Sequence, residues 1–340
     1  MKSKITIALI FCVLIAIAVF FVFIPPRQSS LRFAFFLYDE SDTFIAEMWQ
    51  VIALSMSEDI YYEVFNAGNS QSIQNRQIVE QIEKDFDVFI INAVDRLAGN
   101  TIVERLSRES IPVIFFNREP LEDAMLYHEN VFYVGAAADI MGIQQADIAA
   151  EFFEGTQTIN VVILKGEHGH QDAEKRTENS INRLRELGFN VNVLATRSAS
   201  WRRQDASDVM RSIYSQFGEN IDLVFSNNDD MALGAIDFLL SAGIFYMGMP
   251  IYEQPFIIIS VDGTPVGLEA VYSGLIFATV HNNIEKQTSA ILTLADYLVN
   301  NRNMENFPYE ITNEHFIYIR GDIITRENVI EFINLIDFIQ

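Results

Sequence analysis

The chain has 340 residues, 50% of them hydrophobic and 12% aromatic, and its 46 acidic against 23 basic residues give a formal net charge of −23. This composition is typical of a globular protein and excludes a disordered or fibrous chain. Because the acidic body would repel phosphate backbones, and basic arms and zinc-finger spacings are missing, we exclude nucleic acid as a partner. The length predicts two domains.

The first 30 residues read as a signal peptide or membrane anchor. Residues 5–24 form an almost unbroken apolar run, long enough to span a hydrocarbon core as a helix. Lys2 and Lys4 precede this run, so the positive-inside bias places the rest of the chain outside the cytoplasm. A cleavable signal has a shorter apolar stretch closed by a small-x-small site, which residues 16–18 match poorly. The sequence therefore favours an anchored protein over a secreted one, in the periplasm or on the outer face of the cytoplasmic membrane.

Beyond Arg32, short strand-like runs alternate with amphipathic stretches. The runs cover residues 32–37, 61–65, 87–91, 112–116, 132–134, 161–164, 191–194, 223–225, 256–259 and 277–280. Between them lie stretches with helical apolar spacing, such as 71–84, 173–187 and 231–242. Continuous apolar runs indicate strands buried on both faces, and their alternation with helices predicts parallel, doubly wound α/β sheets. Ten strands are too many for one open sheet in this chain, so we predict two lobes.

Polar and aromatic side chains follow many of these predicted strands. Ligands of parallel sheets bind beyond the carboxyl ends of the strands, and no glycine-rich phosphate-binding motif occurs there. The residues concerned are Asp42, Phe44, Asn117, His170, Asp172, Arg176, Trp201, Asn228, Asp262 and Asn282. Carboxylates, carboxamides and a guanidinium exchange paired hydrogen bonds with vicinal hydroxyls, and aromatic rings cover the C–H faces of a pyranose. This set of side chains predicts a sugar-binding site.

Five stretches around these strand ends carry a family resemblance. They are residues 115–120 (FFNREP), 164–177 (LKGEHGHQDAEKRT), 226–232 (SNNDDMA), 261–263 (VDG) and 278–282 (ATVHN). From about Arg32 to its C-terminus the chain resembles the bacterial periplasmic glucose/galactose-binding proteins of ABC importers and chemotaxis, which are type I periplasmic sugar-binding proteins. The spacing of His170, Asp172 and Arg176 in the second stretch is much more specific than any single residue.

The resemblance implies a role for each of the ten residues. Phe44 and Trp201 would sandwich the pyranose of D-glucose or D-galactose. The hydroxyls and ring oxygen would be hydrogen-bonded by Asp42, Asn117, His170, Asp172, Arg176, Asn228, Asp262 and Asn282. Matching Asp42 and Phe44 requires a two-residue insertion at residues 40–41. The equivalent of Asp42 accepts from the 4-hydroxyl of either epimer in that family, so both sugars would fit.

The resemblance also implies two lobes joined by a three-strand hinge. Residues 31–135 plus 283–318 would form the N-terminal lobe, and residues 136–282 plus 319–340 the C-terminal lobe, after the anchor at residues 1–30. The chain would cross between the lobes near residues 135–136, 282–283 and 318–319. Closure about these crossings would trap the sugar in a monomeric protein.

No cofactor is expected. The family's calcium site is a nine-residue loop before the sixth strand, completed by a distant Glu, and this chain has only Glu154-Gly155-Thr156-Gln157-Thr158 there, with Asp222 at the distant position. A second metal interpretation involves His168, His170, Asp172 and Glu174. It requires strand-like alternation, which Gly169 interrupts, so we do not favour it.

An enzyme remains an alternative, because glycosidases also place two carboxylates around a sugar. Asp42, Asp172 and Asp262 are the candidates. We expect Arg176 and the carboxamides to keep these carboxylates ionised, which leaves no general acid. The chain is therefore predicted to bind its ligand without changing it.

Four polar and aromatic residues at strand ends also have structural explanations. Trp201 could fill the core, although its polar neighbours argue against this. Asn227 and Asn228 could both serve the helix from Asp229, and we expect Asn227 to cap it while Asn228 faces the ligand. Asn92 reads as a structural turn residue.

The sequence thus predicts an extracytoplasmic substrate-binding protein that delivers a hexopyranose to an ABC permease. The predicted anchor leaves a second interpretation open, in which the closed protein acts on a membrane sensor kinase or chemoreceptor. The effector core of a lactose-repressor-type regulator shares the fold but needs a DNA-binding headpiece, and the apolar run occupies that place.

Overall fold

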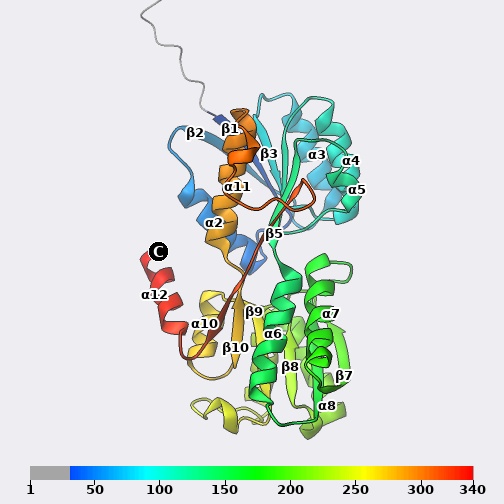
Figure 1. The fold of residues 1–340 in the computed structure, drawn as a ribbon, viewed down its shortest axis with the longest axis vertical. Coiled ribbons are helices and arrows are strands. Elements are labelled where there is room, and N and C mark those ends of the chain that lie inside the picture. The colour runs from blue at the N-terminus through cyan, green and yellow to red at the C-terminus, as the bar shows by residue number, and fades with distance from the viewer. Residues whose placement is uncertain (1–30, 340) are drawn as a thin grey trace, which may run out of the picture.

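The computed structural model describes residues 31–339, with side chains up to residue 334. The predicted anchor at residues 1–30 lies outside these described residues. Within them, every helix is too short or too polar to cross a bilayer. Figure 1 shows two lobes stacked along the long axis of the molecule, each built around one sheet.

Each lobe contains a six-stranded sheet. The sheet of the first lobe has the order β11-β5-β4-β3-β1-β2, and all its pairings are parallel. Its strands are β1 (Leu31–Leu37), β2 (Ile60–Asn66), β3 (Val88–Ile91), β4 (Val113–Phe116), β5 (Val131–Ala136) and β11 (Phe316–Ile319). The sheet of the second lobe has the order β12-β10-β9-β8-β6-β7. Its strands are β6 (Thr158–Lys165), β7 (Asn190–Ser198), β8 (Leu223–Ser226), β9 (Ile257–Asp262), β10 (Ala278–His281) and β12 (Asp322–Thr325).

Helices cover both faces of both sheets. They are α2 (Thr43–Ser55), α3 (Gln71–Ile82), α4 (Gly99–Ser107), α5 (Glu122–Met125), α6 (Ala138–Phe152), α7 (Gln171–Glu186), α8 (Arg203–Phe217), α9 (Asp229–Ser241), α10 (Pro265–Tyr272), α11 (Ile284–Val299) and α12 (Val329–Ile339). In the first lobe α2 and α11 pack on one face of the sheet, and α3, α4 and α5 on the other. In the second lobe α6 and α7 cover one face, and α8, α9, α10 and the start of α12 the other.

This packing explains the apolar runs. Successive side chains of a strand point to opposite faces, so Phe33 and Phe35 enter one core cluster while Ala34 and Phe36 enter the other. The central strands β3, β4 and β8 are buried at every residue. The predicted architecture of two doubly wound α/β lobes is confirmed.

The strand predictions were wrong in two respects. β2 and β7 lie at sheet edges, where each pairs with a single neighbour, and nearly all their residues are half-buried or exposed. β11 and β12 were missed as strands, and β12 pairs antiparallel with β10. Both are only four residues long and no helix separates them, so the strand–helix alternation does not reveal them.

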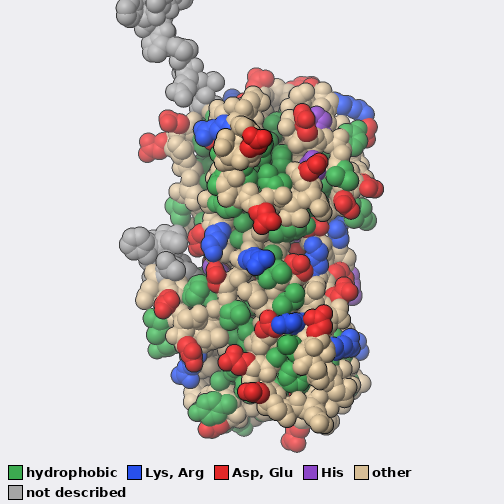
Figure 2. Space-filling view, in the orientation of Figure 1, with side chains coloured by type: hydrophobic (Ala, Val, Ile, Leu, Met, Phe, Trp, Pro, Cys, Tyr) green, Lys and Arg blue, Asp and Glu red, His purple; other side chains and the backbone are tan. Residues whose placement is uncertain are grey.

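The chain passes between the two sheets at three places, between β5 and α6, between β10 and α11, and between β11 and β12. The third crossing is tight. A Cβ at Gly321 would lie 2.6 Å from the carbonyl oxygen of His281, so a larger residue does not fit there. Acidic side chains are spread over both lobes on the face shown in Figure 2 rather than gathered in one patch.

Candidate functional site

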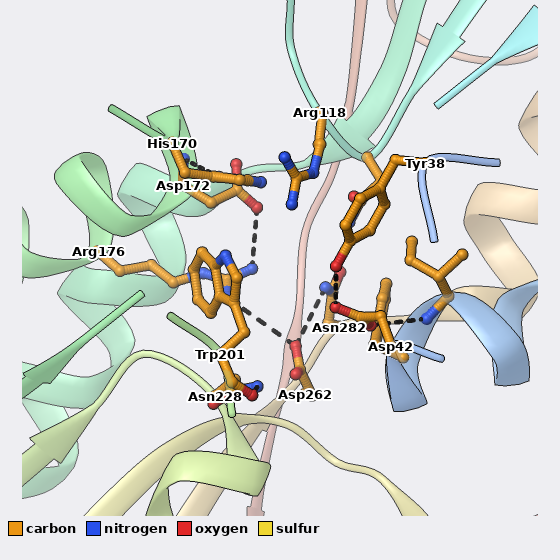
Figure 3. A pocket seen from close by; sticks show the side chains of 13 residues that line it. Tyr38, Asp42, Arg118, His170, Asp172, Arg176, Trp201, Asn228, Asp262 and Asn282 are labelled. Carbon is orange, nitrogen blue, oxygen red and sulfur yellow. Dashed lines mark hydrogen bonds and ion pairs between the residues drawn. The ribbon is translucent and has the colours of Figure 1, made fainter. Parts of the chain in front are cut away.

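A pocket lies between the two lobes, at the carboxyl ends of both sheets. Its lining consists of Tyr38, Asp42, Phe44, Ile45, Asn117, Arg118, His170, Asp172, Arg176, Trp201, Asn228, Asp262 and Asn282. All ten residues predicted from the sequence are therefore brought together (Figure 3).

The first lobe contributes Asp42 from the N-terminus of α2. Its Oδ1 accepts from the backbone N–H of Ile45 at 3.1 Å and so caps the helix, while its Oδ2 accepts from the hydroxyl of Tyr38. The insertion at residues 40–41 therefore does not remove Asp42 from the site. Both oxygens of this carboxylate are oriented by groups within the lobe before any ligand arrives.

Asn117 follows β4 in a left-handed backbone conformation with φ of 59°, a region that Asn tolerates better than most residues. The buried side chain of Asn92 donates to its Oδ1 at 3.1 Å, and the Tyr133 hydroxyl donates to its carbonyl oxygen at 3.0 Å. Asn92 also accepts from the backbone N–H of Tyr38. It thus joins the ends of three strands, in agreement with a structural role.

The second lobe contributes a buried charge cluster around Arg176. Its Nη2 lies 3.0 Å from Oδ2 of Asp172, one helical turn away on α7, and its Nη1 lies 3.9 Å from Oδ1 of Asp262 at the end of β9. Nη1 also donates to the carbonyl oxygen of Asn227 at 2.8 Å. Oδ1 of Asp172 is buried with no hydrogen-bond partner among the described residues, so it is an acceptor available to a ligand.

Burial opposes the effect that Arg176 has on the charge of two of these carboxyl groups, Asp172 and Asp262. Burial raises the pKa of Asp172 and raises the pKa of Asp262 well above its ordinary value. The guanidinium of Arg176 lowers both pKa values, but desolvation is the larger effect. The direction of these pKa shifts therefore does not by itself exclude a general acid at Asp172 or Asp262.

His170 is the N-cap of α7, and its role there fixes the tautomer. Nδ1 accepts from the backbone N–H of Asp172 at 3.2 Å, so the ring proton of the neutral imidazole is on Nε2. Burial lowers the pKa of His170 well below its ordinary value, and the positive charges of Arg118 and Arg176 act in the same direction. The imidazole is therefore neutral at pH 7 and offers one N–H donor to the pocket.

The side chains of His170, Asp172 and Glu174 do not converge on one point where a metal ion could bind. His170 caps the helix, Asp172 pairs with Arg176, and Glu174 pairs with Lys165 at 2.5 Å. In residues 31–334 the side chains of His, Cys, Asp and Glu form no group of three or more that could hold a metal ion.

Trp201 lies between the core of the second lobe and the pocket. It packs against the edge of that core and also lines the pocket, so Trp201 is not only a core residue. Gly166 makes this position possible, because a Cβ there would lie 2.2 Å from the indole ring. Phe44 lines the same pocket from α2 in the first lobe. The two predicted stacking rings thus come from opposite lobes to one cavity.

The remaining polar residues are held by short networks. Asn228 caps α9 by accepting from Met231 N–H at 3.0 Å, and its Nδ2 donates to the carbonyl oxygen of Trp201 at 3.3 Å. Asn227 does not cap this helix, contrary to our prediction. Its Oδ1 instead accepts from the backbone N–H of Gly166 at 3.0 Å, since its side chain turns toward β6.

Asn282 connects the pocket to the hinge. Its Nδ2 donates to Oδ1 of Asp262 at 3.3 Å, and its Oδ1 accepts from Nε2 of Gln287 at 2.6 Å. Gln287 belongs to α11, which packs on the first lobe, whereas Asp262 ends β9 of the second. This chain of bonds therefore bridges the lobes beside one of the three crossings.

Sequence reasoning missed Tyr38 and Arg118, which also line the pocket. Tyr38 directly follows the first predicted strand, and Arg118 lies inside the stretch FFNREP that carried the family resemblance. Both positions therefore met the criterion of lying at a strand end. They were overlooked because the resemblance assigned no sugar contact to either.

The segment at the family's calcium position does not fit a calcium ion. The carboxylate of Asp222 is engaged by the backbone, with Oδ2 accepting from the N–H of Asn160 at 2.7 Å. Residues 154–157 form a short turn that leads into β6 at Thr158, and this segment supplies one carboxylate, that of Glu154. Calcium takes six to eight oxygen ligands, so this donor set is too small.

Comparison with known proteins gives the following similarities. Residues 33–303 match the family model described as a periplasmic binding protein domain. The D-galactose/methyl-galactoside binding periplasmic protein MglB of Haemophilus influenzae is 32% identical over 239 residues, or 68% of this chain and 69% of that protein.

Two solved structures have the same fold. An ABC transporter periplasmic solute-binding protein from Actinobacillus succinogenes, with bound D-allose, has a TM-score of 0.77 at 23% identity and covers 88% of this chain and 99% of its own. The fructose-binding periplasmic domain of a hybrid two-component system has a TM-score of 0.75 at 22% identity, covering 91% and 95%.

Proposed function

This chain belongs to the periplasmic binding protein family, and on that premise we propose that it captures a hexopyranose, D-glucose or D-galactose, in the pocket between its lobes. It is an extracytoplasmic sugar-binding protein of the ABC-transporter type and not an enzyme. The D-galactose named for the Haemophilus influenzae relative supports this choice of sugar.

The observation that carries the proposal is the lining of a single pocket by complementary donors, acceptors and rings. The carboxylates of Asp42, Asp172 and Asp262 accept from hydroxyls, while Arg176 and the neutral His170 donate. Hydrogen bonds to charged groups are worth about 1.5 to 3 kcal/mol each, so an epimer that leaves one of them unpaired is rejected by a similar amount.

Two rings complete the site. Phe44 and Trp201 cover the apolar faces of the pyranose, and two ring faces of about 50 Å² each contribute about 2 to 3 kcal/mol. Because these rings come from opposite lobes, both faces are covered only in the closed molecule. Binding therefore shifts the protein toward closure.

The lobes of this proposal are residues 31–135 plus 283–318 and residues 136–282 plus 319–340. The closed monomer presents both lobes to an ABC permease, which receives the sugar. The second candidate is sensing, in which the protein is tethered through residues 1–30 and acts on a membrane kinase or chemoreceptor. The apolar run of residues 5–24 favours this candidate, because it would hold the protein at the membrane.

Isothermal titration with a panel of sugars tests the proposal. We expect D-glucose or D-galactose to bind with a Kd of about 10 μM or below, and more tightly than D-ribose, D-allose, D-fructose and myo-inositol. Asp262→Asn should abolish most of this binding, whereas Glu174→Gln, an exposed position on α7, serves as the matched control. If neither hexose binds to the wild-type protein, the proposal is wrong.

A further inference from the structure

Arg118 has an unusual position for a charged residue. It follows β4 of the first lobe and is only 6% exposed. Its Nη1 donates to the carbonyl oxygen of Val94 at 2.8 Å, and its guanidinium carbon lies 3.7 Å from the centre of the Tyr38 ring. In Figure 3 the guanidinium of Arg118 points into the space between Asp172 and Tyr38. A buried cation is costly unless its partners compensate it, so this arrangement has to be held by specific contacts.

The first set of contacts leads from Arg118 to Asp42. The planar guanidinium stacks on the Tyr38 ring and thereby limits the orientations of that ring. The Tyr38 hydroxyl donates to Oδ2 of Asp42, and Ile45 N–H binds the other oxygen. Tyr38 thus connects Arg118 with Asp42.

The second contact leads across the cleft. Nη2 of Arg118 lies 2.9 Å from Oε2 of Glu167, which belongs to the loop between β6 and α7 of the second lobe. The same loop ends at His170, the cap of α7. Because the partners lie on different lobes, this ion pair is made when the lobes close and is broken when they open.

The ion pair also lies between the pocket and the solvent. Arg118 lines the ligand pocket and two neighbouring cavities, while Glu167 lines only those two neighbouring cavities. The side chain of Glu167 is 44% exposed, so the ion pair connects the lining of the pocket with the solvent-accessible part of the cleft.

We propose that Arg118 is a positioning residue that couples lobe closure to the orientation of Asp42, through its ion pair with Glu167 and its stacking on Tyr38. This inference rests on the proposed sugar binding. Its consequence is kinetic: the pair acts after the lobes meet, so its loss accelerates sugar dissociation much more than it slows association.

Stopped-flow measurement of D-glucose and D-galactose binding by the full-length protein tests this inference. The set comprises wild type, Arg118→Gln, Glu167→Gln, the double variant and Arg118→Lys. We expect each Gln variant to dissociate about 10- to 100-fold faster, with association changed by less than about 3-fold. The double variant should dissociate no faster than Arg118→Gln, because both changes remove one contact. Arg118→Lys should recover part of the loss through its charge.

A second variant and a matched control make the stopped-flow result interpretable. Glu167 is 44% exposed in its side chain, so Glu167→Gln folds even if Arg118→Gln does not. Glu174→Gln, which removes an ion pair within the second lobe, is the matched control and should dissociate at the wild-type rate. Wild-type dissociation by Glu167→Gln, or additive effects in the double variant, overturns the coupling while sugar binding stands. Failure of the wild-type protein to bind either hexose overturns both proposals.

Discussion

The indole of Trp201 meets the imidazole of His170 edge to face, with ring centroids 5.0 Å apart and an interplanar angle of 77°. Both residues belong to the second lobe, Trp201 in the turn after β7 and His170 at the start of α7. The contact fixes the indole against a residue that is itself held by its capping bond. One wall of the pocket is therefore preorganised within a single lobe, before the other lobe closes on it.

Replacement of Trp201, which forms part of this wall, should weaken sugar binding. We expect Trp201→Ala to reduce affinity for the bound hexose by about 1 to 3 kcal/mol, because one stacking face is lost. The chain has two tryptophans, and the other, Trp49, packs on Phe35 and Tyr62 in the first lobe. Trp49→Phe is therefore the matched control, and its remaining fluorescence should change on sugar addition. An unchanged affinity of Trp201→Ala in titration calorimetry would remove Trp201 from the site.

Gly166 should be intolerant of even the smallest side chain. A methyl group there would lie 2.2 Å from the Trp201 ring, so Gly166→Ala has to displace the indole. We expect an affinity loss similar to that of Trp201→Ala, of about 1 to 3 kcal/mol. In the double variant with Trp201→Ala, the glycine substitution should add little, because the clash is gone. Fully additive losses in calorimetry would contradict this explanation.

The buried pair of Asp172 and Arg176 should matter for folding as well as for binding. The side chains are each 3% exposed, and Asp172→Asn leaves the guanidinium with less compensation. We expect the free energy of unfolding to fall by about 2 to 4 kcal/mol in urea titrations, together with weaker sugar binding. Glu174→Gln on the same helix breaks a pair whose carboxylate is 50% exposed and should cost less than about 1 kcal/mol. If Asp172→Asn and Glu174→Gln lost the same free energy of unfolding, burial of an ion pair would not determine how much that pair stabilises the protein.

Glu47 on α2 should make stability depend on pH. Burial raises its pKa to about 7, and the negative charges of Glu285, Asp229 and Asp230 add to this. Between its ordinary pKa of 4.5 and about 7, the folded protein retains a proton that the unfolded chain has lost. The stabilisation that Glu47 contributes is therefore fully present below pH 4.5 and is lost as the pH rises from 4.5 to about 7.

Glu47→Gln isolates this contribution. Relative to wild type, the variant should gain about 1 to 2 kcal/mol of unfolding free energy between pH 4.5 and 7.5, after allowance for the partial exposure of Glu47. Chemical denaturation of both proteins at a series of pH values measures the difference. A difference that does not change with pH would mean that Glu47 titrates at its ordinary value.

The sequence by itself determined ten of the twelve strands in residues 31–339 and ten of the thirteen residues that line the pocket. Buried central strands such as β3, β4 and β8 were visible because a strand covered on both faces must be apolar at every position. The site residues were visible because the carboxyl ends of parallel strands converge, so residues after different strands meet. Both properties follow from local pattern and from the topology of an α/β sheet.

Only the tertiary structure decided how these residues act on one another. The edge positions of β2 and β7, and the antiparallel pairing of β12, depend on the order of the strands in the sheets. The raised pKa of Asp262 reflects its burial in the folded protein. Asn228 rather than Asn227 caps α9, because the side chain of Asn227 is bonded to the backbone N–H of Gly166. Arg118 pairs with Glu167 from the opposite lobe, 49 positions along the chain. Such contacts leave no periodicity in the sequence, because they join residues that are far apart along the chain and meet only when the strands and helices pack together.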